Sequence, residues 1–236
     1  MAESIEKYKG YRYPIEIIRY AIWLYHRFTV SLRDVEEMLM CRGITVSYET
    51  IREWGIKFGQ TYANEIKRKA PQRGDKWHLD EMCIVINKQK QWLWRAVDQN
   101  GYELDILLQS RRDKSAAKRF FKKLLKGLCY VPRIIVTDKL QSYGAAKKEI
   151  LPYAEHCQHK GLNNQAENSH QPTRNQEKQM RKFKSVQHCQ RFLSVHGQVY
   201  NLFRSWRYKN AANDRRMILT AAFQRWDEIA LQTNCA

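Results

Sequence analysis

Three acidic residues, Asp80, Asp138 and Glu167, have settings that fit a metal-binding site better than scattered surface charge. Asp80 falls inside a run with strand composition, and Asp138 follows the Ile/Val-rich run 133–137. Asp is depleted in strand interiors, and a buried ionised carboxylate is costly unless it is paired or holds a cation. Carboxylates are the protein ligands that hard divalent cations prefer, and two such ions neutralise the charge that develops in phosphoryl transfer. The trio therefore predicts metal-dependent phosphoryl-transfer chemistry.

The evidence from the sequence for a metal-binding role is stronger for some of the three acids than for others. Strand alternation places Asp80 and Glu81 on opposite faces, so we expect that both cannot face one site. Asp138 ends a run apolar enough for a covered central strand, and ligands gather beyond the carboxyl ends of such strands. Glu167 lies in a polar, helix-compatible segment from which its carboxylate can lean toward the sheet, but a helical Glu is usually a solvated surface residue. Two structural alternatives stay open, since Asp80 can pair with an arginine and Asp138 can cap the following turn.

Positive charge dominates the composition and concentrates in the later segments of the chain. Lys and Arg number 42 against 24 Asp and Glu, which gives a formal net charge of +18. Residues 158–216 hold 12 basic and 3 acidic groups, whereas residues 1–72 hold 12 and 9. Solubility alone gives no reason for so concentrated an excess. The charge therefore indicates a polyanionic partner, for which nucleic acid is the obvious candidate.

The first part of the chain has the apolar periodicity of three helices. These are expected over 14–28, from Ser31 to Gly43, and from Ser47 to about Lys69, with the two serines as N-caps. A short turn between the last two helices is typical of a helix-turn-helix, in which the final helix enters the major groove of DNA. An ordinary three-helix bundle is the alternative. The residues expected to reach DNA from the third helix are Tyr48, Glu49, Thr50, Arg52 and Lys57.

A change of periodicity after the loop at 70–75 predicts a second domain, of mixed α/β type. The last third of the chain, from Asn163 onward, is expected to be mostly helical with a break at Pro172. The predicted division is 1–72 for the helix-turn-helix domain, 73–210 for the α/β domain and 211–236 for a helical tail. The elements expected between the loop and the helical end are strands at 76–86, 91–97 and 102–109, a helix capped by Asp113 or Ser115, a strand at 133–137 and a helix at 143–150.

Several other classes of protein and site are less compatible with the sequence. No run approaches the roughly 18 apolar residues of a membrane span, and the N-terminus lacks the order of a signal peptide. We therefore expect a soluble, cytoplasmic protein without a membrane partner. The six cysteines form no C-x-x-C pair, so reduced thiols are expected. Zinc is a minor alternative, because the spacing of its candidate ligands fits no standard module; those ligands are His156, Cys157, His159, His188 and Cys189.

Five blocks of sequence point together to one family. They are Trp-His-Leu-Asp80-Glu81, Trp92-Leu-Trp-Arg-Ala-Val-Asp98, Ser110-Arg-Arg-Asp-Lys-Ser-Ala-Ala-Lys-Arg-Phe-Phe121, Val136-Thr-Asp138-Lys and Leu162-Asn-Asn-Gln-Ala-Glu167-Asn-Ser-His. Together they resemble the insertion-sequence-six family of bacterial DDE transposases, and the resemblance covers nearly the whole chain. It implies an RNase H-like catalytic domain, that is, a mixed sheet with flanking helices. It also implies that Asp80, Asp138 and Glu167 hold two Mg²⁺ or Mn²⁺ ions, and that Arg174 is a basic catalytic residue.

Two features of this chain depart from the family pattern. Asp138 and Glu167 are only 29 positions apart, a shorter separation than in many DDE enzymes, so the segment between them must be trimmed. Pro172 stands between Glu167 and Arg174, and a kink there would remove Arg174 from the face that carries the glutamate. Both features make the region around Glu167 the one where structure matters most.

The function expected from these observations is that of a transposase acting on double-stranded DNA, both element ends and target. The helical head would bind terminal inverted repeats. The second domain would cut DNA and join the freed 3′ hydroxyl to a target, by a replicative cointegrate route, in a homodimer or larger synaptic assembly associated with the bacterial nucleoid. Phosphate contacts are expected from Lys118, Arg119, Lys122 and Lys123. The alternatives are a relative that cuts without joining and a non-catalytic regulator.

Overall fold

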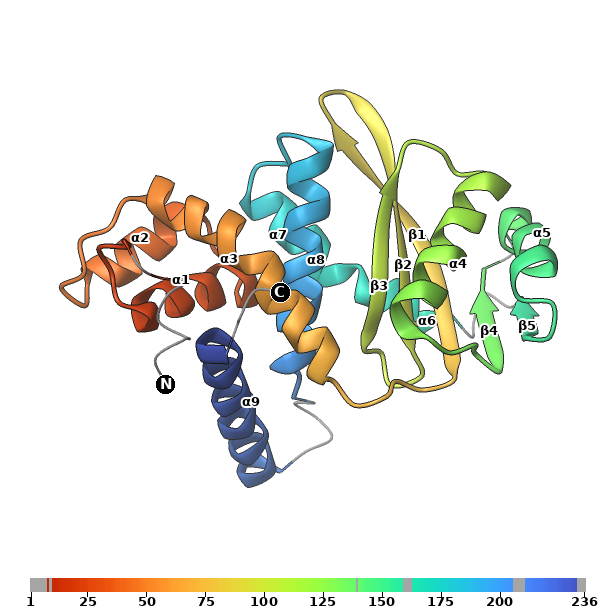
Figure 1. Cartoon of the computed structure of the whole chain (residues 1–236). Coiled ribbons are helices and arrows are strands. Elements are labelled where there is room, and N and C mark those ends of the chain that lie inside the picture. The colour runs from red at the N-terminus through yellow and green to blue at the C-terminus, as the bar shows by residue number, and fades with distance from the viewer. Residues whose placement is uncertain (1–7, 9, 139, 159–162, 206–210, 233–236) are drawn as a thin grey trace. The chain divides into compact units, whose positions relative to one another are not determined.

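The computed structural model describes residues 8, 10–138, 140–158, 163–205 and 211–232 (Figure 1). By its internal contacts the chain divides into two compact units. Unit 1 combines residues 1–70 with 194–236, and unit 2 comprises residues 71–193. The division falls within a single helix, α8 (Val186–Leu202).

Unit 1 is built from helices at both ends of the chain: α1 (Ile15–Arg27), α2 (Leu32–Met40), α3 (Tyr48–Lys69) and α9 (Ala212–Gln232). The expected start of α2 is confirmed, because the Ser31 hydroxyl accepts from the Asp34 amide while the Asp34 carboxylate accepts from the Ser31 amide. The helix ends at Met40, three residues before the predicted end at Gly43. Gly43 instead sits in the following turn with a φ of 74°, a conformation that favours glycine.

The core of unit 1 is aromatic. Trp54, Phe58 and Tyr62 of α3 recur at helical spacing and are almost completely buried. The ring of Tyr62 meets that of Trp226, in α9, edge to face at 5.1 Å. The C-terminal helix therefore contributes side chains to the same core as the helical head.

Unit 2 contains a five-stranded mixed sheet in the order β3-β2-β1-β4-β5. β1 and β2 are antiparallel, as are β2 and β3, whereas β4 runs parallel to both β1 and β5. This order and these directions are those of an RNase H-like sheet, which confirms the expected fold class. β5 was not predicted, because Glu-His-Cys-Gln has no apolar alternation. The strands are β1 (Lys76–Ile86), β2 (Gln89–Asp98), β3 (Glu103–Gln109), β4 (Ile134–Thr137) and β5 (Glu155–Gln158).

Helices α4 (Lys114–Leu128) and α5 (Gln141–Ile150) form one layer of unit 2. Alternate strand residues such as Trp77, Leu79 and Trp94 pack with the apolar side of α4 and with Tyr143 of α5 in one buried cluster. The odd-numbered residues of this part of β1 thus face the core, and the even-numbered residues face the opposite side of the sheet. Asp80 is one of the latter.

The helical end of unit 2 breaks two residues earlier than Pro172. α6 (Asn164–Ser169) and α7 (Gln171–Gln179) are separated by a single residue, His170. Pro172 lies in the first turn of α7, where a missing backbone N–H removes no intrahelical bond. A break is present, but it lies before the predicted position, and the proline stands in the first turn of a helix and does not kink one.

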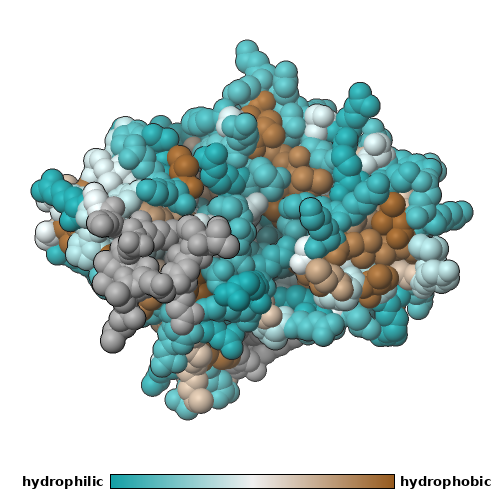
Figure 2. Space-filling model, viewed as in Figure 1, coloured by the Kyte–Doolittle hydropathy of each residue, from teal (hydrophilic) through white to brown (hydrophobic). Residues whose placement is uncertain are grey.

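Hydrophilic residues cover most of the face shown in Figure 2, and hydrophobic residues form separate patches on it. This surface agrees with the strongly polar, basic composition. Among the described residues, no helix is long and apolar enough to cross a membrane.

The N-cap of α4 gives a direct test of this local structure. The Asp113 carboxylate accepts a hydrogen bond of 2.8 Å from the Ala116 amide, whereas Ser115 lies exposed inside the helix. Asp113→Ala should therefore cost about 1 kcal/mol of stability, and Asp113→Asn much less, because Asn is also a good N-cap. Urea denaturation midpoints measure the difference. Ser115→Ala is the control, and an equal loss there would contradict the assignment of Asp113 as the cap.

Candidate metal centre

The two aspartates meet because of the parallel register between neighbouring strands. β1 pairs with β4 so that Leu79 lies opposite Thr137. The next residue on each strand is Asp80 and Asp138, respectively. Asp138 is thus the first residue beyond the carboxyl end of β4, where parallel strands gather their ligands. The predicted meeting of these two acids follows from strand pairing alone.

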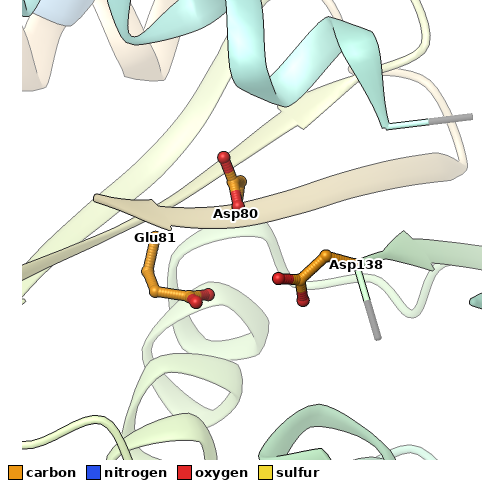
Figure 3. Close-up of side chains that lie close together, drawn as sticks. All are labelled: Asp80, Glu81 and Asp138. Atoms are coloured by element: carbon orange, nitrogen blue, oxygen red, sulfur yellow. The ribbon is translucent and has the colours of Figure 1, made fainter. Parts of the chain in front are cut away.

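Glu81 is the third acid of the cluster. One carboxylate oxygen from each of Asp80, Glu81 and Asp138 lies within 4.8 Å of the others. In Figure 3, Asp80 leaves β1 on one side, whereas Glu81 and Asp138 direct their carboxylates toward each other on the other side. Strand alternation is therefore confirmed, but the expectation that Asp80 and Glu81 cannot share a site is wrong. Asp138 lies at a strand end, so its carboxylate is close both to Asp80 on one face of the sheet and to Glu81 on the other.

Glu81 is held on the core side of the sheet by Arg112. The Arg112 Nε donates to Glu81 Oε1 at 2.6 Å, and its guanidinium lies 4.8 Å from the centre of the Trp92 ring. The Glu81 side chain is fully buried, with the Tyr143 ring of α5 nearby. Burial raises the pKa of Glu81 to about 7, against the lowering effect of hydrogen bonds and of the Arg112 charge. The carboxyl group therefore exchanges its proton near neutral pH.

Asp138 combines a structural contact with an open side. Its Oδ1 accepts from the Leu140 amide at 3.0 Å, so the aspartate does cap the following turn. Its Oδ2 lies 3.8 Å from Arg112 Nη2, an ion pair too long for a hydrogen bond. The side chain is about one third exposed, with a relative accessibility of 31%. Capping and metal binding are therefore compatible, because they use different oxygens.

Asp80 is bound from the opposite face by His170, the residue between α6 and α7. His170 Nε2 lies 3.1 Å from Asp80 Oδ2. Across the sheet, Asp80 is directly opposite Arg95 of β2, whose guanidinium reaches His170 Nδ1 at 3.3 Å. Burial lowers the pKa of His170, although the hydrogen bond to Asp80 opposes that effect. Among the residues that the structure describes, Asp80 therefore does not hydrogen-bond an arginine directly. It contacts His170, and Arg95 contacts the other nitrogen of that ring.

Glu167 and Arg174 lie on different helices. Glu167 is exposed on α6, and no described contact joins its carboxylate to the acid cluster. α6 itself contacts β1 and β2. Arg174 is about half exposed on α7, with its Nη1 3.4 Å from Glu177. The roles predicted for Glu167 and Arg174 stay predictions.

The cluster has the chemistry of a site for a divalent cation. All its donors are carboxylate oxygens, the ligands that Mg²⁺ and Mn²⁺ prefer. Glu81 Oε2 is buried and has no hydrogen bond of ordinary geometry within the described part of the chain, so it has capacity for a cation. Among the described residues, this is the one group of three or more His, Cys, Asp and Glu side chains close enough to share an ion. The zinc alternative is unsupported there, and His159 lies outside those residues.

Of the basic residues of α4 that were predicted to contact phosphates, most form ion pairs or hydrogen bonds within the protein. Lys118 pairs with Glu149, Arg119 donates to Gln109 at 2.7 Å, and Lys123 donates to Asp105 at 2.7 Å. Lys122 is exposed. Of the four, Lys122 is the best placed for a phosphate.

The predicted reading helix exposes part of its first three turns. Arg52 donates to Glu49 at 2.8 Å, and both side chains are half exposed. Thr50 takes part in the N-cap with Ser47, and the ring of Tyr48 is stacked by Arg33 at 5.1 Å. Lys57 lies 4.6 Å from the centre of the Tyr11 ring. Arg52 and Lys57 are therefore the basic side chains that this part of α3 itself exposes.

Sequence reasoning missed three residues around the acids: Arg95, Arg112 and His170. Arg95 carried a usable signal, because it is a charged residue within the apolar run Trp-Leu-Trp-Arg-Ala-Val. The contacts of Arg112 and His170 join segments 31 and 90 residues apart, and no local pattern encodes such pairs.

A family model and similar curated proteins agree on one family. The DDE_Tnp_IS240 model, described as a DDE domain, matches residues 74–205. The transposase for insertion sequence-like element IS431mec of Staphylococcus aureus (strain Mu50 / ATCC 700699) is 32% identical over 160 residues, covering 66% of this chain and 71% of that protein. The transposase for insertion sequence element IS257 in transposon Tn4003 of Staphylococcus aureus gives the same identity and coverage. Among solved structures, a chain of the simian T-cell lymphotropic virus intasome in complex with PP2A regulatory subunit B56 gamma has a TM-score of 0.39 and 13% identity, covering 61% of this chain and 52% of that one.

The raised pKa of Glu81 predicts a pH dependence of stability. Because the folded protein keeps the Glu81 proton up to about pH 7 while an unfolded glutamate loses it near 4.5, folding binds a proton between these values. The contribution of this proton to the free energy of unfolding is complete below pH 4.5 and is lost as pH rises through 7. The free energy of unfolding falls by at most about 1.4 kcal/mol per pH unit. Urea denaturation between pH 4.5 and 8, with a chelator present, should show a slope that Glu81→Gln reduces. Glu155→Gln, at an exposed acid, should leave the slope unchanged; if both variants behave alike, Glu81 does not titrate near neutrality.

Proposed function

This chain belongs to the insertion-sequence-six family of DDE transposases, enzymes that cut and join DNA, and from that membership we propose that Asp80 and Asp138 form the core of its catalytic site. The observation that carries the proposal is the β1 and β4 register, which brings Asp80, within β1, next to Asp138, just beyond the carboxyl end of β4.

The DDE domain implies a divalent metal, and we assign it to these carboxylates as two Mg²⁺ or Mn²⁺ ions. When bound, the ions supply positive charge to the attacking and leaving oxygens of a phosphodiester. The chain itself holds the carboxylates in place: Leu140 and Arg112 orient Asp138, and His170 orients Asp80. Lys122 and Arg174, both with exposed cationic side chains, are the proposed phosphate contacts.

Glu167 is the proposed third ligand, because it stands in the family block and because its helix lies on β1 and β2. The opposite face of the sheet offers a rival in Glu81, which already stands within the cluster. The pairing of Glu81 with Arg112 favours a supporting role, since that buried carboxylate already has a cationic partner. Direct comparison of the two glutamates decides between them.

The proposed reaction is strand cleavage followed by strand transfer. Hydrolysis breaks a P–O bond at the element end and frees a 3′ hydroxyl. That hydroxyl then attacks a target phosphodiester, so that one P–O bond forms as another breaks and no covalent protein intermediate arises. A replicative, cointegrate-forming outcome and a homodimeric or larger assembly that holds two ends are proposed from family membership.

We assign recognition of the terminal inverted repeats to the helical head, through a helix-turn-helix formed by α2 and α3. The exposed Arg52 and Lys57, in the first half of α3, support this assignment. The connection between the helices spans residues 41–47, which is longer than a minimal turn. α9 packs against α1 and α3, so point substitutions test the assignment better than removal of the head.

Replacing the aspartates tests the catalytic assignment. Asp80→Asn or Asp138→Asn should lower metal-dependent cleavage of a duplex containing the element end by more than about a hundredfold, because several kcal/mol of charge stabilisation is lost. Binding of the same duplex, measured by gel shift, should persist. Asp75→Asn is the matched control, since Asp75 is an exposed aspartate paired with Arg133 in the same unit.

Two further variants identify the third carboxylate. Glu167→Gln should lose cleavage as the aspartate variants do, whereas Glu81→Gln should retain a measurable rate. The reverse result would transfer the role to Glu81. Cleavage that survives in Asp80→Asn would refute the whole assignment.

Two arginines of α3 form a matched pair for testing DNA reading. Arg52 and Arg68 each pair with a glutamate three residues earlier, Glu49 and Glu65, but lie at opposite ends of the helix. Arg52→Ala should reduce the preference for element ends over unrelated duplex by about 1–3 kcal/mol, whereas Arg68→Ala should leave it unchanged. Competition binding at fixed salt measures the preference. Equal effects of the two variants would argue for general electrostatic attraction and against a reading helix.

A further inference from the structure

We propose that Arg95 is a positioning residue of the metal centre: a buried guanidinium that fixes α6 and His170 and thereby sets Glu167 and Asp80 for metal binding. The inference rests on the proposed function, because it takes Glu167 and Asp80 as ligands. Arg95 does not touch the acids' expected ions or the DNA; it acts through the groups that it holds.

Arg95 uses its whole guanidinium within the protein. The residue is 2% exposed, and its Nε forms an ion pair of 3.0 Å with Glu103 of β3. Nη1 donates to the Ser169 carbonyl at the end of α6, and Nη2 donates to the Thr173 hydroxyl in α7 at 2.7 Å. One side chain of the sheet thus binds the end of one helix and the start of the next. Its full burial explains why the charge needs a partner such as Glu103.

The contact with His170 also determines how that ring meets Asp80. Arginine has donors and no acceptor, so His170 Nδ1, 3.3 Å from Arg95 Nη1, must be the acceptor of the neutral ring. Nε2 then carries the proton and donates to Asp80 Oδ2 at 3.1 Å. Outer hydrogen bonds of this kind orient metal-binding carboxylates. Arg95 therefore fixes the orientation of Asp80 by fixing the tautomer of His170.

The other end of α6 is attached to the same strand as Asp80. Asn163, fully buried immediately before α6, donates from Nδ2 to the Leu79 carbonyl at 2.9 Å. Arg95 binds the carbonyl of Ser169, the last residue of the helix. A six-residue helix makes few internal hydrogen bonds, so its position depends on these end contacts. Glu167 stands between the two attachment points.

Lysine cannot reproduce this arrangement. An ammonium group is a point charge on a flexible stem, whereas the planar guanidinium directs separate donors to Ser169, His170 and Thr173 at once. Arg95→Lys therefore keeps the charge opposite Glu103 but loses the simultaneous contacts with the two helices. This separates the positioning role from the charge.

The test combines direct metal binding with a map of what surrounds the metal. Mn²⁺ affinity of the full chain is measured by electron paramagnetic resonance, without DNA. Fe²⁺ with ascorbate and peroxide is then used to cut the backbone near the bound ion. In the unsubstituted chain we expect cuts near residues 80, 138 and 167. In Arg95→Lys we expect Mn²⁺ affinity about tenfold weaker or worse, and loss of the cut near 167 while those near 80 and 138 remain.

Leu124→Ala controls for general destabilisation. Leu124 is fully buried on α4 in the opposite layer, so this variant lowers the melting temperature without altering an Arg95 contact. It should keep the Mn²⁺ affinity within about threefold and the complete cutting pattern. If Arg95→Lys behaves like Leu124→Ala, with only its melting temperature changed, Arg95 is merely structural and the inference is overturned.

Two more variants complete the test. Thr173→Val has nearly the shape of threonine and removes one Arg95 contact; it should weaken Mn²⁺ binding in the same direction, and it decides the question if Arg95→Lys does not fold. Unchanged binding and cutting in Thr173→Val, in that case, overturn the inference. Glu167→Gln tests the proposed function on which this inference rests, namely that Glu167 is a metal ligand. If it binds Mn²⁺ as the unsubstituted chain does, the proposed ligand set fails, a result distinct from failure of Arg95→Lys alone.

Discussion

The metal centre depends on the pairing of two parallel strands in a single register. With Leu79 opposite Thr137, the next residues are two aspartates at adjacent positions, one within a strand and one just beyond a strand end. A shift of one residue would move Asp80 to the other face of the sheet and would separate the pair. The apolar cluster of α4 and α5 against Trp77, Leu79 and Trp94 fixes that register, because those side chains are buried only when the correct face is turned inward. The register of β1 and β4 therefore determines both the packing of the core and the geometry of the metal centre.

Three carboxylates within 4.8 Å would repel one another strongly without compensation. The fold supplies a partner for each from a different segment: Arg112 for Glu81, the Leu140 amide for Asp138 and His170 for Asp80. These partners leave oxygens available, including the buried Oε2 of Glu81. The centre is thus kept stable as a protein structure while it retains the capacity to take up cations in an otherwise basic chain.

Local patterns in the sequence predicted most of the fold and part of the site. Ile/Val runs, turn residues and caps such as Ser31 and Asp113 are encoded within a few neighbours, so the first four strands and the early helices could be placed. β5 could not, since its four residues pair with β4 without an apolar pattern. Among the site residues, the neighbouring aspartates followed from strand position. The contacts of Arg95 and His170 did not, because they form only when distant segments pack together.

The buried ion pair of Arg95 and Glu103 has a consequence for how this sequence can diverge. Loss of Glu103 alone removes the carboxylate that pairs with a buried arginine, and loss of Arg95 alone removes the guanidinium that pairs with a buried carboxylate. Each first step is therefore harmful, even where the double replacement would be tolerated by the sheet. The two positions form an epistatic pair, and relatives that diverge elsewhere are expected to change both or neither. A substitution history reconstructed along the family would show these positions changing together.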